Sequence, residues 1–135
     1  MALDLSSFRK ALASLEEAVA FSAPEADEHL RNIVRAGVVK NFEFTYELCW
    51  EFMKRWLETN VEPTVADGVT RRELFRLAAE QRLIDDVDAW MSYHEARNQT
   101  SQRYDAEVAE MACLAARDLF LNARALLTAL EARND

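Results

Sequence analysis

Glycine and proline are scarce in this sequence, with two residues of each among 135. An average protein carries about 12% of the two together. A β-sandwich or β-barrel of this length needs about six tight turns, which depend on glycine, asparagine or proline for their backbone angles. The scarcity therefore excludes most turn-rich folds. The 22 alanines, the strongest helix formers, favour an all-α protein, and we expect a single domain over residues 1–135.

Basic residues are outnumbered, 16 against 24 acidic ones, which gives a net charge of −8. This balance argues against a protein that coats nucleic acid by neutralising its phosphates. A local positive site is still compatible with the sequence, because residues 69–104 contain six arginines, no lysine and six acidic residues. Arginine can bind a phosphate through two parallel hydrogen bonds, so this segment is the candidate for an anion site.

Long apolar runs are missing, since no stretch of about 18 uncharged apolar residues occurs and the N-terminus has no basic region followed by an apolar one. We therefore expect a cytoplasmic protein without membrane contact. The two cysteines, Cys49 and Cys113, form no CxxC pattern and no Cys/His pair at metal-ligand spacing. We expect two buried thiols, no disulfide, no metal and no cofactor.

Apolar residues recur every three or four positions along most of the chain, as in amphipathic helices. A first helix is predicted over residues 4–21. Residues 22–25 (SAPE) have the form of a capping box, which predicts a second helix from there to about Asn60, bent at Gly37. Residues 42–52 also alternate in polarity as a strand does, but the nearby charges fall on one helical stripe. We therefore expect one long central helix.

The second half of the chain begins with a loop, predicted at residues 61–69 because they contain proline and glycine. A capping box then opens a short helix over residues 70–83, and a fourth helix is predicted over residues 85–97. Residues 98–104 are polar and lack periodicity, which predicts a loop. Asp105 is expected to cap a last helix. Its inner stripe is rich in small residues: Ala109, Ala112, Cys113, Ala116, Leu119, Phe120, Ala123, Leu126, Leu127 and Leu130.

No Gly-rich phosphate loop, HExxH metal motif or nucleophile elbow is present. A resemblance is carried instead by five segments: residues 35–50 (RAGVVKNFEFTYELCW), 71–73 (RRE), 83–85 (LID), Trp90 and 97–105 (RNQTSQRYD). Together they resemble the nucleotidyltransferase substrate-binding proteins, a branch of the HEPN superfamily. The resemblance spans roughly residues 5–130.

This resemblance implies an up-and-down bundle of four or five helices that forms a homodimer and binds a minimal nucleotidyltransferase encoded beside it. Some such pairs are toxin and antitoxin, in which the helical member cuts RNA without a metal. The toxin signature is an arginine followed, after four to six residues, by a histidine. A longer form adds a tyrosine two residues later, to which the partner can attach AMP. By this comparison Arg97 is the motif arginine, Tyr104 is the motif tyrosine, and Gln102 stands at the histidine position.

Gln102 departs from the signature in a way that matters for chemistry. Cleaving RNA at a 2′-hydroxyl needs a group that gains and loses a proton near neutral pH, which a glutamine amide does not do. The amide can hold a phosphate or a base edge, so we expect nucleotide or RNA binding with weak or no cleavage. Asn98 and Ser101 are candidate substrate-binding residues together with Tyr104. His94, one helical turn before the motif arginine, is the candidate replacement for the missing histidine.

Each candidate also has a purely structural explanation. Arg97 can cap a helix C-terminus or pair with Asp105, and His94 can be an amphipathic residue at a helix end. Tyr104 can pack in a loop with its hydroxyl in water. The arginines at residues 71–72 lie in the first turn of a helix, where the dipole disfavours cations. Phosphate or partner binding would explain them, and so would a solvated helix face.

Three functions follow. The leading one is a HEPN-type subunit that binds a minimal nucleotidyltransferase and helps to bind or present its substrate or nucleotide. The second is a metal-independent ribonuclease toxin that its partner silences. The third is a dimeric helical scaffold without a site. A homodimer is also expected because the two long helices carry more large apolar residues than one bundle of this size can bury.

Overall fold

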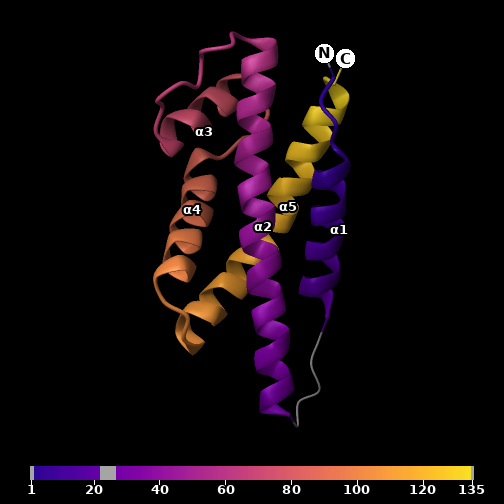
Figure 1. Ribbon diagram of the computed structural model, residues 1–135, viewed down its shortest axis with the longest axis vertical. Helices are drawn as coiled ribbons and strands as arrows, with labels where there is room; N and C mark the ends of the chain where they lie inside the picture. The colour runs from indigo at the N-terminus through magenta and orange to yellow at the C-terminus, as the bar shows by residue number, and fades with distance from the viewer. Residues whose placement is uncertain (1, 22–26, 135) are drawn as a thin grey trace.

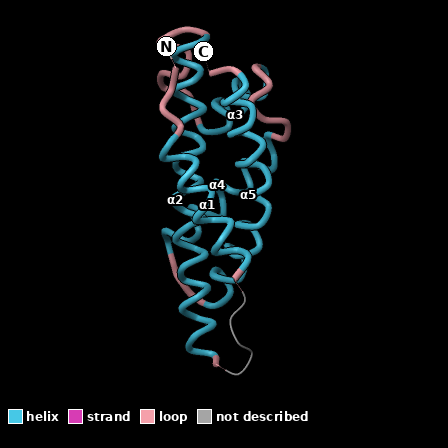
Figure 2. Tube along the Cα trace, turned by 90° about the vertical axis from the view of Figure 1, so that its right-hand side faces the viewer, coloured by secondary structure: helices cyan, strands magenta, loops and turns pink. Residues whose placement is uncertain are grey.

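The computed structural model describes residues 2–21 and 27–134, which form helices joined by short connections (Figure 1). The helices are α1 (Ser6–Ala20), α2 (Glu28–Asn60), α3 (Arg71–Glu80), α4 (Val87–Gln102) and α5 (Ala106–Ala132). No strand occurs in the described residues, which confirms the expected all-α bundle. The two ends of the chain lie together at one end of the bundle (Figure 2).

Helix α2 is the central element, and it packs against each of the other four helices (Figure 1). The long central helix predicted here is confirmed, because residues 42–52 lie in the middle of α2 and form no strand. Phe42, Tyr46, Cys49 and Phe52 are buried at helical spacing, whereas Phe44 is 51% exposed. The apparent alternation arises because α2 is covered by neighbours on several sides and is apolar on most of its circumference.

Helix α5 supplies the small side chains predicted for its inner stripe. Ala112, Ala116 and Ala123 are fully buried, and they alternate along the helix with buried leucines. Alanine at such positions lets a neighbouring helix approach closely. As a result α5 packs against α1, α2 and α4, and all five helices contribute to one apolar core.

Four of the helices begin at a side-chain cap, in which an oxygen accepts from the backbone N–H three residues ahead. The capping residues are Asp27, Thr70, Asp86 and Asp105. Each one satisfies a donor that has no partner within its own helix. The caps predicted before α3 and α5 are confirmed, and Asp86 caps α4 close to the predicted start of that helix. The box predicted at residues 22–25 lies outside the described residues, and α2 begins at Glu28, later than the sequence predicts.

Helix α4 is longer than the sequence predicts, because residues 98–102, expected to be a loop, form its last turn. The Ser101 hydroxyl donates to the backbone carbonyl of Asn98, and the Thr100 hydroxyl lies 2.9 Å from the backbone carbonyl of Arg97. Arg103 then leaves the helix with extended backbone angles, φ −153° and ψ 156°. The turn shows no apolar periodicity because the groups it faces on α2 are polar, so the pattern used to find helices is absent here.

Helix α3 ends at Glu80 instead of near Leu83. Arg82 adopts the left-handed conformation, with φ 61°, which turns the chain out of the helix. Arg133, just after α5, donates to the backbone carbonyls of Gln81 and Arg82. The end of the chain therefore holds the turn that leads from α3 into α4.

Candidate functional site

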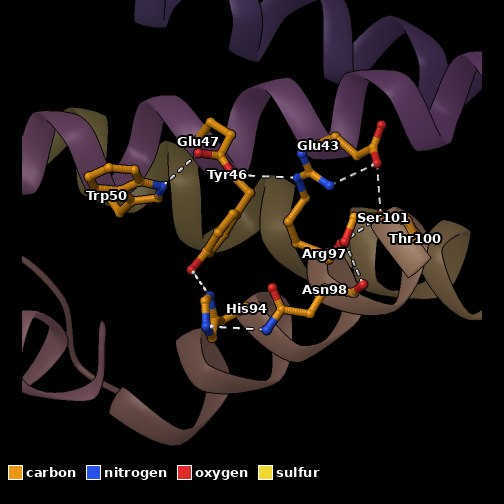
Figure 3. Close-up of polar contacts among 9 residues, drawn as sticks. All are labelled: Glu43, Tyr46, Glu47, Trp50, His94, Arg97, Asn98, Thr100 and Ser101. Atoms are coloured by element: carbon orange, nitrogen blue, oxygen red, sulfur yellow. Dashed lines mark hydrogen bonds and ion pairs between the residues drawn. The ribbon is translucent and has the colours of Figure 1, made fainter. Parts of the chain in front are cut away.

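A polar cluster lies along the contact between α2 and α4, within an otherwise apolar bundle (Figure 3). Its members on each helix are three or four residues apart, so each set shares one helical face. They are Glu43, Tyr46, Glu47 and Trp50 on α2, and His94, Arg97, Asn98, Thr100 and Ser101 on α4. We refer to these nine residues as the α2–α4 cluster.

The guanidinium of Arg97 is the centre of the α2–α4 cluster (Figure 3). Its Nη1 lies 3.2 Å from Glu43 Oε2, and its Nε lies 3.4 Å from Glu47 Oε1, an ion pair without hydrogen-bond geometry. Thr100 Oγ1 donates to the same oxygen of Glu43 at 2.8 Å. The Arg97 side chain is 28% exposed, and partial exclusion of water strengthens these attractions. Two carboxylates face one guanidinium, so Arg97 is already engaged by the protein.

Tyr46 and His94 form the second link between the helices. Tyr46 Oη lies 2.8 Å from His94 Nδ1. Burial raises the pKa of Tyr46 far above its ordinary value, so the hydroxyl stays protonated and donates a hydrogen bond to Nδ1. Burial, followed by the positive charge of Arg71, lowers the pKa of His94 below its ordinary value. His94 is therefore a neutral imidazole near pH 7.

This pairing also assigns the His94 tautomer. Because Nδ1 accepts from the Tyr46 hydroxyl, the imidazole proton is on Nε2. Nε2 lies 3.4 Å from Asn98 Nδ2, which is also a donor, so this contact is not a hydrogen bond in the assigned tautomer. In this state neither ring nitrogen is free to take a proton. His94 is thus held as a structural partner of Tyr46, a poor starting state for a general base.

The sequence-predicted residues are brought together only in part. Arg97, His94 and Asn98 meet in the α2–α4 cluster, as their helical spacing predicts. Ser101 is exposed, and its hydroxyl donates to the backbone carbonyl of Asn98 at 2.7 Å. Gln102 is the last residue of α4 and its side chain is exposed.

Tyr104 lies apart from the α2–α4 cluster, in the short connection before α5. Its side chain is 55% exposed and lines a cavity of about 270 Å³ that also contains Asn32 and Arg35 of α2. Burial is the main reason that its pKa is raised, while Arg35 acts in the opposite direction. The cation that lines this cavity is Arg35, whereas Arg97 pairs with Glu43 and Glu47 in the α2–α4 cluster.

The alternative pairing of Arg97 with Asp105 is wrong, because Asp105 pairs with Arg103 at 3.0 Å.

Sequence reasoning missed the α2 half of the cluster. The sequence predicts Glu43 and Glu47 on a solvated stripe and Tyr46 in the core, yet all three contact residues of α4. The sequence signal for this half of the cluster is that Glu43, Tyr46 and Glu47 recur at three- and four-residue spacing within an aromatic-rich helix. Arg35 was also missed as a neighbour of the tyrosine, because this contact joins residues far apart in the chain.

Other sequence expectations can be compared with the described residues. None of their helices is long and apolar enough to cross a membrane. Within the same residues, His, Cys, Asp and Glu side chains form no group of three or more that could hold a metal. Cys49 is buried as expected, but Cys113 is only half-buried because it lies at the edge of the α5 stripe.

Comparison with known proteins supports the sequence resemblance. The family model described as "Nucleotidyltransferase substrate binding protein like" matches residues 3–132. A Haemophilus influenzae protein named "Probable ribonuclease HepT" is 35% identical over 100 residues, which cover 73% of this chain and 68% of that protein.

Two solved structures share the fold. One, from Haemophilus influenzae, is described as revealing the fold of a substrate binding domain of a nucleotidyltransferase. It is 28% identical, covers 95% of this chain and 99% of its own, and superposes with a TM-score of 0.87. The other, from Thermus thermophilus, is 23% identical with a TM-score of 0.74, covers 91% and 98% of the two chains, and shows the fold alone.

The neutral state of His94 predicts a pH dependence of stability. An unfolded histidine takes a proton near pH 6.5, whereas the folded His94 resists it, so its contribution is complete above about pH 6.5 and is lost as pH falls toward the lower folded pKa. We expect the free energy of unfolding to drop less between about pH 7.5 and 5.5 in His94→Gln than in the unmodified protein. Urea denaturation at both pH values measures this.

His29, an exposed histidine of α2, is the matched control, and His29→Gln should behave as the unmodified protein does. An equal drop for His94→Gln and the unmodified protein would contradict the assigned neutral state.

Proposed function

The chain belongs to the nucleotidyltransferase substrate binding protein like family, and from this premise we propose that it is a HEPN-type subunit that binds a minimal nucleotidyltransferase. In this role it helps to bind or present the substrate or nucleotide on which that enzyme acts. The observation that carries the proposal is the α2–α4 cluster, a half-buried polar site without a free proton-transfer group, in a bundle that superposes closely on a nucleotidyltransferase substrate-binding domain. Binding without bond cleavage is the chemistry that such a site supports.

A homodimer is part of this proposal. Besides Tyr104, five large apolar side chains among residues 2–21 and 27–134 are more than half exposed: Phe21, Ile33, Phe44, Leu114 and Leu121. All of these except Phe21 lie on α2 or α5, the two long helices in which the sequence carries its apolar surplus. Exposed apolar surface of this kind is commonly covered by a second subunit or a partner.

A metal-independent ribonuclease is the second candidate, favoured by the relative named "Probable ribonuclease HepT". Three features of this chain disfavour strong activity. Arg97 is engaged by two carboxylates, which would also repel an RNA phosphate. Gln102 does not titrate, and His94 has no free acceptor nitrogen when it is paired with Tyr46.

Tyr104 is proposed as the residue that the partner modifies with AMP. Of the three tyrosines, Tyr46 and Tyr93 are 1% and 3% exposed, whereas Tyr104 is 55% exposed. In the transfer, the Tyr104 oxygen attacks the α-phosphorus of ATP, the bond to pyrophosphate breaks, and the hydroxyl proton is released. Arg35 supports this proposal because its guanidinium lines the same cavity and can pair with the new phosphate.

The partner role predicts a stable complex with the minimal nucleotidyltransferase encoded beside this chain. We expect the free chain to sediment as a dimer at tens of micromolar, roughly the range of ordinary self-association, and to form a larger species when the partner is added. Analytical ultracentrifugation of each protein and of the mixture measures both. If the two proteins sediment independently, the partner role is contradicted and the scaffold without a site remains. If the free chain sediments as a monomer, the proposed homodimer is contradicted.

The loss of the titrating residue predicts that the isolated chain cuts RNA poorly. Gln102→His should raise cleavage by about tenfold or more, since it restores a group that transfers protons near neutral pH. Gln99→His, which places a histidine on the same helix three residues earlier, is the matched control and should change nothing. Strong cleavage by the unmodified chain that is abolished by His94→Ala would instead make His94 the acid or base.

The Tyr104 proposal predicts a single AMP adduct after incubation with the partner, ATP and magnesium. Intact-mass and peptide mass spectrometry locate the adduct, which should disappear in Tyr104→Phe. Arg35→Met should lower the yield without abolishing it, because Arg35 stabilises the phosphate but is not the acceptor. An adduct on another residue, or one that persists in Tyr104→Phe, would refute the assignment.

A further inference from the structure

A second cavity, of about 530 Å³, lies at the α3 end of the bundle. Its walls come from α2, from the loop before α3 and from the first turn of α3, and His94 of α4 also lines it. Cavities of this size, roughly 300–1,000 Å³, hold small organic ligands in other proteins. Tyr104 is not among the lining residues, so this cavity is distinct from the one proposed for AMP transfer.

Arg71 is the residue that gives this cavity its chemical character. Its guanidinium carbon lies 3.6 Å from the centre of the Trp50 ring, so the group is stacked on the indole. Trp50 is itself held in place, because its Nε1 donates to Glu47 Oε2 at 2.9 Å. The stacking fixes the guanidinium, and none of its N–H groups donates a hydrogen bond to another of the described residues.

The Nε of Arg71 is buried and has no hydrogen-bond partner in the part of the chain that the structure describes. A buried donor without a partner is rare, because losing water without a new hydrogen bond is unfavourable. No carboxylate of the described residues pairs with Arg71, whereas the adjacent Arg72 lies 3.4 Å from Asp88. Thr45, Trp56 and Arg97 also carry a buried polar atom without a partner among the described residues, so the orphaned donor alone identifies no ligand. Together with the missing carboxylate partner it leaves the charge of Arg71 available to a group from outside the chain.

The surroundings favour a partner with negative charge. Lys54 also lines the cavity, and its ammonium is engaged only by Glu58, at 3.6 Å, among the described residues. Asp67 is the acidic lining residue, so two cations face one carboxylate. Arg71 stands in the first turn of α3, where the positive end of the helix dipole repels a cation but attracts an anion. An anion at this place would remove that conflict.

We propose that this cavity binds the phosphate group of a small phosphorylated ligand, with Arg71 and Lys54 as its anion-binding residues. A guanidinium offers two parallel N–H donors that match phosphate oxygens, and a second cation favours a dianion over a carboxylate. The volume leaves room for the remainder of a mononucleotide beside the phosphate. The identification of the ligand as a nucleotide rests on the proposed function, but phosphate binding itself does not require the partner enzyme.

The test uses the whole chain alone, so its outcome is separate from that of the partner experiment. The indole N–H signals of Trp50, Trp56 and Trp90 are followed by two-dimensional NMR during titration with inorganic phosphate, AMP or ATP at constant ionic strength. We expect the Trp50 signal to shift and saturate, with ATP or AMP binding more tightly than phosphate. Trp56 and Trp90, which do not line the cavity, are internal controls. Adenosine and acetate should leave Trp50 unchanged, because each lacks a phosphate.

Matched variants identify the residues. Arg71→Met should weaken binding of AMP by about tenfold or more, and Arg72→Met by less than about twofold, since only Arg71 lines the cavity. Lys54→Met should weaken binding several-fold, whereas Lys40→Met, an exposed lysine of the same helix, should not. Arg71→Lys keeps the charge but loses the paired donors, so weakened binding in this folded variant separates a binding role from a structural one.

Three results would overturn the proposal. The first is the absence of a saturable shift of the Trp50 signal with phosphate, AMP or ATP up to about 10 mM, since weaker binding would be non-specific. The second is equal weakening by Arg71→Met and Arg72→Met. The third is an equal response to adenosine and AMP, which would assign the cavity to the base and not to the phosphate.

Discussion

The ion pairs of Arg97 with Glu43 and Glu47 are the interaction on which the site depends, because they hold α4 against α2 through polar groups. Removing charged groups from water is costly, and the cost is offset only when the charges are paired and hydrogen-bonded. Here Thr100 adds a hydrogen bond to Glu43, and the whole group is only partly buried. This contact sets the register that brings His94 opposite Tyr46.

The family signature suggests that Arg97 and Tyr104 act at one site, but the ion pairs of Arg97 separate the roles of these two residues. Arg97 is committed to carboxylates of α2, so a phosphate on Tyr104 would meet Arg35 instead. The cavity with Arg71 and Lys54 is lined by the loop before α3 and by its first turn. Tyr104 follows the C-terminal end of α4, the end that lies away from α3 (Figure 1). The chain thus offers an acceptor hydroxyl at one end and a cationic cavity at the other. The α2–α4 cluster lies next to that cavity, because its Trp50 and His94 also line it.

Much of the fold could be predicted from the sequence, because it depends on local signals. Apolar periodicity located the helices, and Thr70 and Asp105 were predicted as caps from their own chemistry. The last turn of α4 could not be found this way, since it contacts polar groups and carries no apolar stripe. The site was predictable only on α4, where spacing places His94, Arg97 and Asn98 on one face. Glu43 and Glu47 were not, because pairing across helices depends on register, which no local pattern encodes.

The most direct test of this account is a double-mutant cycle on Arg97 and Glu43, measured by urea unfolding of Arg97→Met, Glu43→Gln and the double variant. The exposed pair Arg72 and Asp88, 3.4 Å apart, provides the control cycle. If Arg97 is held by α2 as described, the coupling free energy should be about 1–2 kcal/mol, against roughly 0–0.5 kcal/mol for the exposed pair. Equal and negligible coupling in both cycles would contradict the account, because Arg97 would then be free to serve the site in another way.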